Sequence, residues 1–286
     1  MGGPGYDPGT LERLYYPTAP CAAAAKTTSE GPATLTPNPQ PAATSPDVSV
    51  VIPVCNEEEN VLPLAREIHA ALAGRFAFEQ IFVDDGSTDR TATAVGEARA
   101  QGMPEIRLLR HVHRSGQSAA VATGVRHARG RWIATLDGDG QNDPADFPKL
   151  LDALLQPASP KLKLVMGNRT TRRDTWLRRV SSRVANGVRS SILGDGTPDT
   201  GCGIKVFDRD VFMHMPRFRN MHRFMPALFQ REGYEVMSLP VNHRERTRGT
   251  SKYGLHNRLW VGIVDLFGVS WLIRRASPRA PVHEET

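Results

Sequence analysis

Two short acidic runs, each placed directly after a strand-like apolar segment, constrain this chain more than any other feature. Residues 83–87 read Val-Asp-Asp-Gly-Ser after an apolar segment at 80–83, and residues 137–141 read Asp-Gly-Asp-Gly-Gln after another at 132–136. Ligands of open α/β sheets bind beyond the carboxyl ends of the strands. We therefore expect two neighbouring strand ends to bring their carboxylates together around a divalent cation. Mg²⁺ completes such a shell with water and substrate phosphates, so the runs predict a nucleotide-like substrate.

The charge balance favours anionic partners. The chain has 286 residues and a net charge of +6, which suits nucleic acid, acidic lipid headgroups or phosphorylated substrates. Its three cysteines, Cys21, Cys55 and Cys202, are widely spaced and form no metal-binding pattern, which favours reduced thiols in a cytosolic protein. We see neither a secretory signal nor an apolar run of about 18 residues, and therefore expect no spanning helix.

Strand and helix patterns alternate along the first half of the folded region. We expect strands at 48–52, 81–83, 106–109 and 132–136. A helical pattern follows each strand: residues 61–72 with Asn56 as cap, residues 90–100, residues 115–129, and a helix that Asp143-Pro144 starts. This order predicts an α/β fold, with a mainly parallel sheet that helices cover on both faces.

The remaining segments are less regular. Residues 1–46 are rich in Pro, Gly, Ala and Thr, which predicts a disordered tail, and we place the folded domain at 47–255. Within it we expect a strand at 164–166, a helix at 176–193 and strands at 203–207 and 235–241. The direction of the last two strands stays open.

The C-terminal region, residues 256–286, carries an apolar run at 259–273 with a tryptophan near each end. Arg258 precedes the run and Arg274-Arg275 follow it. The run is short for a bilayer span and contains Asp265, so it predicts an amphipathic helix at a membrane interface, followed by a short tail. The alternative is a C-terminal helix that packs on the core.

The second acidic run has the spacing of a metal site. In extended chain, Asp137, Asp139 and Gln141 place their side chains on one face. Two carboxylates and an amide oxygen suit Mg²⁺ or Mn²⁺ that also binds a diphosphate. The alternative is an Asp-Gly turn in a solvated loop. In the first run, we expect Ser87 or Asp89 to cap a helix while a neighbouring carboxylate accepts hydrogen bonds from a base or ribose.

Two common phosphate-binding motifs are absent. The first strand ends in Pro-Val-Cys-Asn-Glu at 53–57, where a dinucleotide fold needs G-x-G-x-x-G, and the sequence contains no GxxxxGK[ST]. The phosphates must therefore be held by metal and by basic side chains. The candidates are Arg169, Arg178, Arg179, Arg246 and Lys252, although most single arginines of this region would lie on a solvated helix face.

Taken together, these motifs resemble family 2 glycosyltransferases of the GT-A (Rossmann-like) fold. Within that family they resemble the dolichol-phosphate mannose synthase and bacterial polyprenyl-phosphate glycosyltransferase branch. The resemblance covers about residues 48–255. It rests on the runs at 51–60, 83–89, 137–144, 167–169, 199–203 and 246–254.

The resemblance implies a role for each matching residue. The nucleotide site would comprise Pro53, Asn56, Glu57, Val83, Asp85, Asp137, Arg246 and Lys252. The metal, Mg²⁺ or Mn²⁺, would be held by Asp137, Asp139 and Gln141. The acceptor phosphate would meet Arg169, Arg178, Arg179 and Ser182. Asp139, Arg169 and Asp199 would be the catalytic groups, with Asp199 orienting the sugar or acting as an auxiliary base.

Three features depart from the family pattern. Cys55 stands where an aromatic residue is usual, which puts base stacking in doubt. Gly138 and Gly140 stand where Ala and Leu are commoner, which predicts a more mobile loop. The sequence ends at Thr286, whereas relatives with appended transmembrane helices continue, so it resembles the peripheral type.

The motifs and the resemblance together predict a metal-dependent, inverting transfer of a sugar, and the resemblance implies a slight preference for mannose. The donor would be a GDP- or UDP-sugar, the acceptor a polyprenyl or dolichyl monophosphate, and the location the cytoplasmic face of a membrane. One alternative is a glycosyltransferase that acts on a sugar, lipid or protein hydroxyl, which would need a carboxylate base. A nucleic-acid-binding module around residues 169–189 is disfavoured, because acidic strand ends repel a phosphate backbone. Intact metal ligands argue against an inactive membrane scaffold. The oligomeric state stays open.

Overall fold

The computed structural model describes residues 45–169, 187, 189–245 and 255–276. Nearly all of the predicted tail, residues 1–46, lies outside them. The first half contains β1 (Val48–Val54), α1 (Glu58–Leu72), β2 (Phe78–Asp84), α2 (Thr91–Ala100), β3 (Ile106–Arg110), α3 (Gln117–His127), β4 (Trp132–Thr135), the 3-10 turn η3 (Pro144–Asp146) and α4 (Phe147–Leu155). The second half contains β5 (Leu162–Arg169), β6 (Lys205–Asp208), α6 (Arg209–Met213), the 3-10 turn η4 (Met221–Arg223), α7 (Met225–Arg231), β7 (Glu235–Val241) and α8 (Leu255–Arg274).

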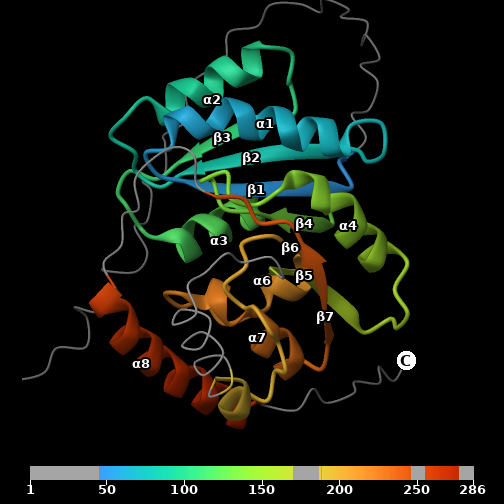
Figure 1. Ribbon diagram of the computed structural model, residues 1–286, viewed down its shortest axis with the longest axis vertical. Helices are drawn as coiled ribbons and strands as arrows, with labels where there is room; N and C mark the ends of the chain where they lie inside the picture. The colour runs from blue at the N-terminus through green and yellow to red at the C-terminus, as the bar shows by residue number, and fades with distance from the viewer. Residues whose placement is uncertain (1–44, 170–186, 188, 246–254, 277–286) are drawn as a thin grey trace, which may run out of the picture. The chain divides into compact units, whose positions relative to one another are not determined.

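The described strands form one mixed sheet in the order β3-β2-β1-β4-β6-β5-β7 (Figure 1). The pairs β1–β2, β2–β3, β1–β4 and β5–β7 are parallel, whereas β6 runs antiparallel to both β4 and β5. The predicted mainly parallel α/β sheet is therefore confirmed, and β6 is its one antiparallel strand among the described residues.

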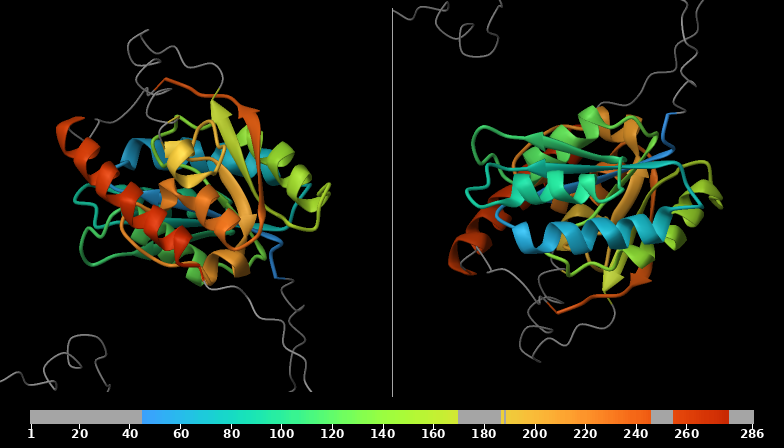
Figure 2. Two further views of the ribbon diagram at one scale, coloured as in Figure 1. Left: turned by 90° about the horizontal axis from the view of Figure 1, so that it is seen from below. Right: turned by 90° about the horizontal axis from the view of Figure 1, so that it is seen from above.

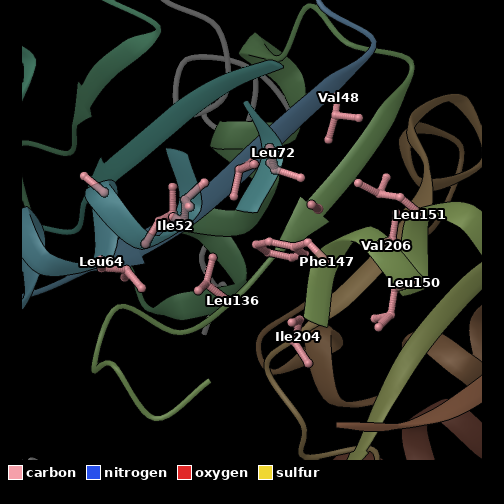
Figure 3. Packing of buried hydrophobic residues seen from close by; sticks show 14 of the residues in the cluster. Val48, Ile52, Leu64, Leu72, Leu136, Phe147, Leu150, Leu151, Ile204 and Val206 are labelled. Atoms are coloured by element: carbon pink, nitrogen blue, oxygen red, sulfur yellow. The ribbon is translucent and has the colours of Figure 1, made fainter. Parts of the chain in front are cut away.

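Helices cover both faces of this sheet (Figure 2). Apolar residues of α1, α2 and α4 pack on one face, and those of α3, α6 and α7 pack on the other. Phe147, Leu150 and Leu151 of α4 lie beside Ile204 and Val206 (Figure 3). Phe147 is fully buried, so truncating it to Ala would cost about 3–5 kcal/mol.

The strand topology corrects one expectation. The two acidic runs follow β2 and β4, which are not neighbours, because β1 lies between them. Each run therefore has its own surroundings, and the carboxylates of the two runs do not form one joint cluster of metal ligands.

The start of α1 corrects another expectation. We expected Asn56 to cap this helix, but the helix begins at Glu58 and Asn56 has a positive φ of 50°. The Asn56 side chain instead accepts a hydrogen bond from the Thr88 main-chain N–H at 2.8 Å. The cap at Asp143 is confirmed, since its carboxylate accepts from the Ala145 N–H at the start of η3.

Candidate active site

The carboxyl ends of six strands meet at one edge of the sheet. Parallel pairing places the ends of β1, β2, β3 and β4 there. Because β6 is antiparallel to both β4 and β5, β5 runs in the same direction as β4, and β5 and its parallel neighbour β7 also end there. The loop before β6 begins at the same edge. Residues from 54, 84, 137, 169 and 199–203 are therefore gathered by topology, although long stretches of sequence separate them.

Asp137, in the run after β4, is held from several directions. Its Oδ1 accepts a hydrogen bond from Gln117 Nε2 at 2.6 Å, and its main-chain N–H donates to Asn142 Oδ1 at 3.2 Å. A Cβ placed on Gly203 would lie 2.4 Å from Asp137 Oδ2, so only glycine leaves room for this carboxylate. Burial raises the pKa of Asp137, and the nearby Asp139 adds to the rise, while Lys205 and Arg169 oppose it.

Asp139 and Gln141 lie further along the same run and are partly exposed. The Gln141 N–H donates to Asp139 Oδ1 at 3.2 Å, and the Gln141 carbonyl accepts from the Arg244 N–H at 2.9 Å. Gly140, between them, has φ 72°, which favours glycine. The described residues contain no group of three or more His, Cys, Asp or Glu side chains arranged for a metal. A site of two carboxylates and one amide still fits Mg²⁺ or Mn²⁺, whose remaining ligands are water and phosphate.

Gly138 belongs to a closely packed part of this run. A Cβ placed there would lie 2.6 Å from Val54 Cγ1 and 2.9 Å from the Pro53 carbonyl oxygen. The absence of a side chain therefore lets the run approach the end of β1. This packing explains why a glycine stands at position 138. The greater loop mobility expected from the sequence stays a prediction.

The run after β2 is buried and internally bonded. Asp84 accepts from Arg110 Nε at 3.1 Å and from the Ser87 N–H at 2.8 Å. Asp85 Oδ1 lies 2.8 Å from His111 Nδ1 and accepts from the Ser115 N–H at 2.8 Å, while Oδ2 accepts from the Gly116 N–H at 2.8 Å.

These bonds decide the electrostatics of Asp85. Burial alone would raise its pKa, but the bonds from His111, Ser115 and Gly116 outweigh burial and hold the pKa below the ordinary value for Asp. Asp85 is therefore an ionised acceptor that fixes the loop between β3 and α3.

The other expected nucleotide contacts differ in their exposure. Pro53, Asn56 and Glu57 are partly exposed at the end of β1. Glu57 accepts from Asn60 Nδ2 at 2.7 Å, and its N–H donates to Thr91 Oγ1 at 2.8 Å. The Val83 side chain is fully buried in the core under α3, so it does not face a ligand at this edge.

Arg169 and Asp199 form a two-pronged ion pair at the end of β5. Arg169 Nε donates to Asp199 Oδ2 at 2.6 Å, and Nη2 donates to Oδ1 at 2.7 Å. Burial would lower the pKa of Arg169, but the paired carboxylate outweighs it and keeps that pKa above its ordinary value. Behind the pair, the ammonium group of buried Lys205 donates to the Cys202 carbonyl.

Five predicted ligands belong to segments that the structure does not describe. Arg178, Arg179, Ser182, Arg246 and Lys252 lie outside the described residues. Of the helix expected at 176–193, residues 189–193 are helical. The predicted site residues that the structure describes lie at the ends of β1, β2, β4 and β5 or in the loop before β6, at one edge of the sheet.

Several residues of this edge were missed by the sequence reasoning. Gln117, His111, Lys205 and Arg244 each contact a predicted residue or its loop. For Gln117 a signal existed, because it follows a Ser-Gly pair in the loop between β3 and α3, on the ligand-binding edge. For Lys205 none existed, since a lysine within an apolar run carries no indication of its partners.

Comparison with known sequences decides the family. The sequence matches the family described as Glycosyl transferase family 2 over residues 49–215. The chain belongs to this family. It is therefore a glycosyltransferase, as the motifs predicted.

The curated relatives belong, by their names, to the predicted polyprenyl-phosphate branch. The chain is similar to the dodecaprenyl-phosphate galacturonate synthase of Rhizobium johnstonii, with 35% identity over 80% of this chain and 68% of the relative. It is also similar to the undecaprenyl-phosphate 4-deoxy-4-formamido-L-arabinose transferase of Edwardsiella ictaluri, with 34% identity over 73% of this chain and 63% of the relative. The chain thus spans about two thirds of the length of these relatives.

Solved structures confirm the GT-A fold. The mannosyltransferase PcManGT from Pyrobaculum calidifontis, in complex with GDP-Man and Mn²⁺, matches with a TM-score of 0.59 at 23% identity, over 88% of this chain and 70% of that one. Glucosyl-3-phosphoglycerate synthase from Mycobacterium tuberculosis, in complex with Mg²⁺ and UDP, matches with a TM-score of 0.59 at 18% identity, over 81% of this chain and 79% of that one. At these identities the likeness concerns the fold alone.

Proposed function

We propose that this glycosyltransferase transfers a sugar from a nucleotide diphosphate to a polyprenyl monophosphate, at a membrane surface and with inversion at the anomeric carbon. One structural observation carries the proposal. The oxygen ligands of the run after β4 and the Arg169–Asp199 pair lie around the same loop, residues 199–203. A Cβ placed on Gly203 would lie 2.4 Å from Asp137 Oδ2, and one placed on Gly201 would lie 3.2 Å from Arg169 Nη2. Groups for a metal diphosphate thus lie beside the partly buried guanidinium of Arg169, which suits a second phosphate.

We assign the metal, Mg²⁺ or Mn²⁺, to Asp139 first, with Asp137 and Gln141 as supporting ligands. Asp137 has protein groups against both carboxylate oxygens, whereas Asp139 and Gln141 are partly exposed. When bound, the metal would act as a Lewis acid that stabilises the departing diphosphate. Pro53, Asn56 and Glu57 would border the nucleotide, and Asp85 would hold the loop beside it.

The acceptor phosphate supplies its own nucleophile. Its second pKa is about 6, so it is largely ionised near neutral pH and needs no strong base. A phosphate oxygen attacks the anomeric carbon, a new C–O bond forms, and the C–O bond to the nucleotide diphosphate breaks, so the nucleotide diphosphate leaves. Arg169 would orient the attacking phosphate through its guanidinium group.

Asp199 fits a positioning role better than that of a base. Both of its oxygens already accept hydrogen bonds from Arg169, so it fixes the guanidinium plane. This contact also disfavours transfer to a hydroxyl acceptor, which would need a carboxylate base. Arg178, Arg179 and Ser182 on the acceptor side, and Arg246 and Lys252 on the donor side, are proposed from the family resemblance.

We further propose that α8 brings the enzyme to the lipid. One side of α8 packs on the core through Leu266, Val269 and Leu272, while Val264, Phe267 and Trp271 are 68%, 65% and 62% exposed. These three lie three and four residues apart and share one helical face. Arg274 and Arg275 follow and are exposed, which suits anionic headgroups. Among the described helices, none is both long and apolar enough to cross a bilayer. In this account residues 47–255 form the catalytic domain, and residues 256–286 supply the helix for the cytoplasmic leaflet and a tail.

Vesicle sedimentation tests the membrane proposal. The double variant Phe267→Ser, Trp271→Ser should bind vesicles of anionic phospholipid at least about tenfold more weakly, because two large apolar side chains no longer enter the interface. Val112→Ser is the matched control, since Val112 is 89% exposed but lies in the loop after β3. Equal binding by the double variant and wild type would remove this role of α8.

The activity itself is tested with a panel of labelled nucleotide sugars. Enzyme and membranes that contain polyprenyl phosphate are incubated with GDP-mannose, UDP-glucose, UDP-galacturonate and a UDP-amino-arabinose derivative, and label is counted in the lipid extract. We expect one donor to label lipid in a reaction that chelation of divalent metal abolishes. GDP-mannose tests the slight preference for mannose, and two of the other donors carry the kinds of sugar named in the curated relatives. Label in polysaccharide or protein with none in lipid would favour a hydroxyl acceptor.

A further inference from the structure

Four consecutive residues before and in the first turn of α3 are each tied to another part of the sheet edge. The N–H groups of Ser115 and Gly116 donate to Asp85, after β2, both at 2.8 Å. The Gln117 side chain donates to Asp137, after β4, at 2.6 Å. The Ser118 hydroxyl lies 2.7 Å from Nδ1 of His222, in η4. Residues 115–117 therefore link the two acidic runs past the end of the intervening β1.

The backbone at Gly116 makes this link possible. Its φ is 91°, which L side chains rarely adopt, and a Cβ placed there would meet nothing within 4 Å. The need for glycine is therefore conformational rather than spatial. The turn lets two successive N–H groups reach one carboxylate and still starts α3 with Gln117 facing Asp137.

Gln117 supplies a hydrogen-bond donor to the carboxylate of Asp137. Gly203 packs against Oδ2 of Asp137, and Asn142 binds its main-chain N–H, so these contacts limit where the carboxylate can move. Among the described residues, only the Gln117 amide donates a hydrogen bond to a side-chain oxygen of Asp137. A neutral donor fixes the orientation of the carboxylate without cancelling its charge, which a lysine or arginine would do.

From this geometry we propose that Gln117 is a positioning residue for the metal–nucleotide complex: it orients Asp137 and, through residues 115–116, couples the run after β4 to the run after β2. The inference rests on the proposed function, in which Asp137 supports the metal. Without the Gln117 N–H donor, the Asp137 carboxylate rotates, and the metal loses affinity while the fold persists.

Calorimetric titration tests this without turnover. UDP or GDP is titrated into wild type and into Gln117→Met, each with and without Mn²⁺. Met keeps the length and volume of Gln but has no N–H donor. We expect the strengthening of nucleotide binding by Mn²⁺ to fall about tenfold in Gln117→Met, with metal-free nucleotide binding unchanged, because one charge-assisted hydrogen bond is lost. Gln156→Met, at an exposed glutamine after α4, should match wild type.

A double-variant cycle separates positioning from general damage. If Gln117 acts through Asp137, then Gln117→Met combined with Asp137→Asn should lower Mn²⁺-dependent binding no further than Asp137→Asn alone. Additive losses would overturn the inference. Gln117→Ala repeats the test if the Met variant does not melt cooperatively. Wild-type Mn²⁺ enhancement retained by both Gln117 variants would overturn the inference alone, whereas absence of any Mn²⁺ enhancement in wild type would overturn the proposed function and the inference with it.

Discussion

The acidic runs after β2 and after β4 look alike in sequence but have different surroundings. After β2, Asp84 is fully buried and Asp85 is 4% exposed, and main-chain N–H groups donate to both carboxylates. After β4, Gly138 separates the two acids, Asp139 is partly exposed, and burial raises the pKa of Asp137. The same residue type is therefore buried among main-chain N–H donors at one strand end and partly exposed at the other.

The pKa shifts of Asp85 and Asp137 have opposite directions, in line with these different surroundings. Donors arranged around Asp85 stabilise its charge and lower its pKa, whereas burial and Asp139 destabilise the charge of Asp137. A carboxylate that lacks stabilisation in the protein alone gains most from a cation. The contrast supports the proposal that the metal binds the run after β4, and the following predictions test that proposal in order of expected effect.

Asp139→Asn should have the largest effect. We expect turnover to fall at least about a hundredfold, because the stabilisation of the leaving diphosphate is lost. The free energy of unfolding should change little, since Asp139 is partly exposed. Initial rates of lipid labelling and urea unfolding check the two parts. Near-normal turnover of Asp139→Asn would contradict the proposal that the run after β4, unlike the run after β2, binds the metal.

Asp85→Asn should chiefly affect stability. An amide can keep one acceptor oxygen, but its NH₂ group would face a donor N–H of the loop, so we expect unfolding to become easier by about 2–3 kcal/mol. Urea denaturation measures this change. A variant as stable as wild type would show that the three bonds to Asp85 do not hold the loop.

His222, which lies against Ser118 in the first turn of α3, gives the stability of the protein a pH dependence. Burial, with Lys205 and Arg223 nearby, lowers the pKa of His222 to about 3 from 6.5. The unfolded chain thus takes up this proton near pH 6.5 and the folded protein only near pH 3, so stability is lost as the pH falls through that window. The loss between pH 7 and pH 5 should be about 2 kcal/mol.

The matched variant for this prediction is His222→Asn, whose side-chain oxygen can accept from Ser118 but cannot be protonated in this range. Melting temperatures from pH 7 to pH 5 should fall less steeply in the variant than in wild type. Parallel profiles would show that His222 titrates normally in the folded protein.

Gly203→Ala should have a smaller effect that is confined to the run after β4. Its Cβ would lie 2.4 Å from Asp137 Oδ2 and 2.7 Å from Asn142 Oδ1, so the carboxylate must move. We expect turnover to fall about tenfold, since small misplacements in a site are costly. Gly96→Ala, in α2, is the control, because its Cβ would meet nothing within 4 Å.

Local patterns in the sequence were enough for the parallel half of the sheet. Apolar runs such as 48–54 form buried strands, and Asp143-Pro144 starts a helical segment, because both depend on residues close in the chain. The same logic placed the acidic run 137–141 just after a buried strand, as the structure has it, while its role as a metal site stays a prediction.

What could not be predicted depends on contacts between distant residues. The insertion of β1 between the acidic strands, the reversal of β6 and the pairing of Gln117 with Asp137 are set by packing across the sheet. The helices α6 and α7 are only 5 and 7 residues long, which is too short for a periodic signal. The roles of all the predicted site residues stay predictions, and Arg178, Arg179, Ser182, Arg246 and Lys252 also lie outside the described residues.

The central claim is that the run after β4, and not the run after β2, binds the metal with the nucleotide. Electron paramagnetic resonance of free Mn²⁺, titrated into enzyme saturated with nucleoside diphosphate, tests it directly. We predict that wild type and Asp84→Asn each remove one Mn²⁺ per chain from the free signal, and that folded Asp139→Asn removes almost none. Full Mn²⁺ binding by Asp139→Asn, or its loss in a folded Asp84→Asn variant, would contradict the account.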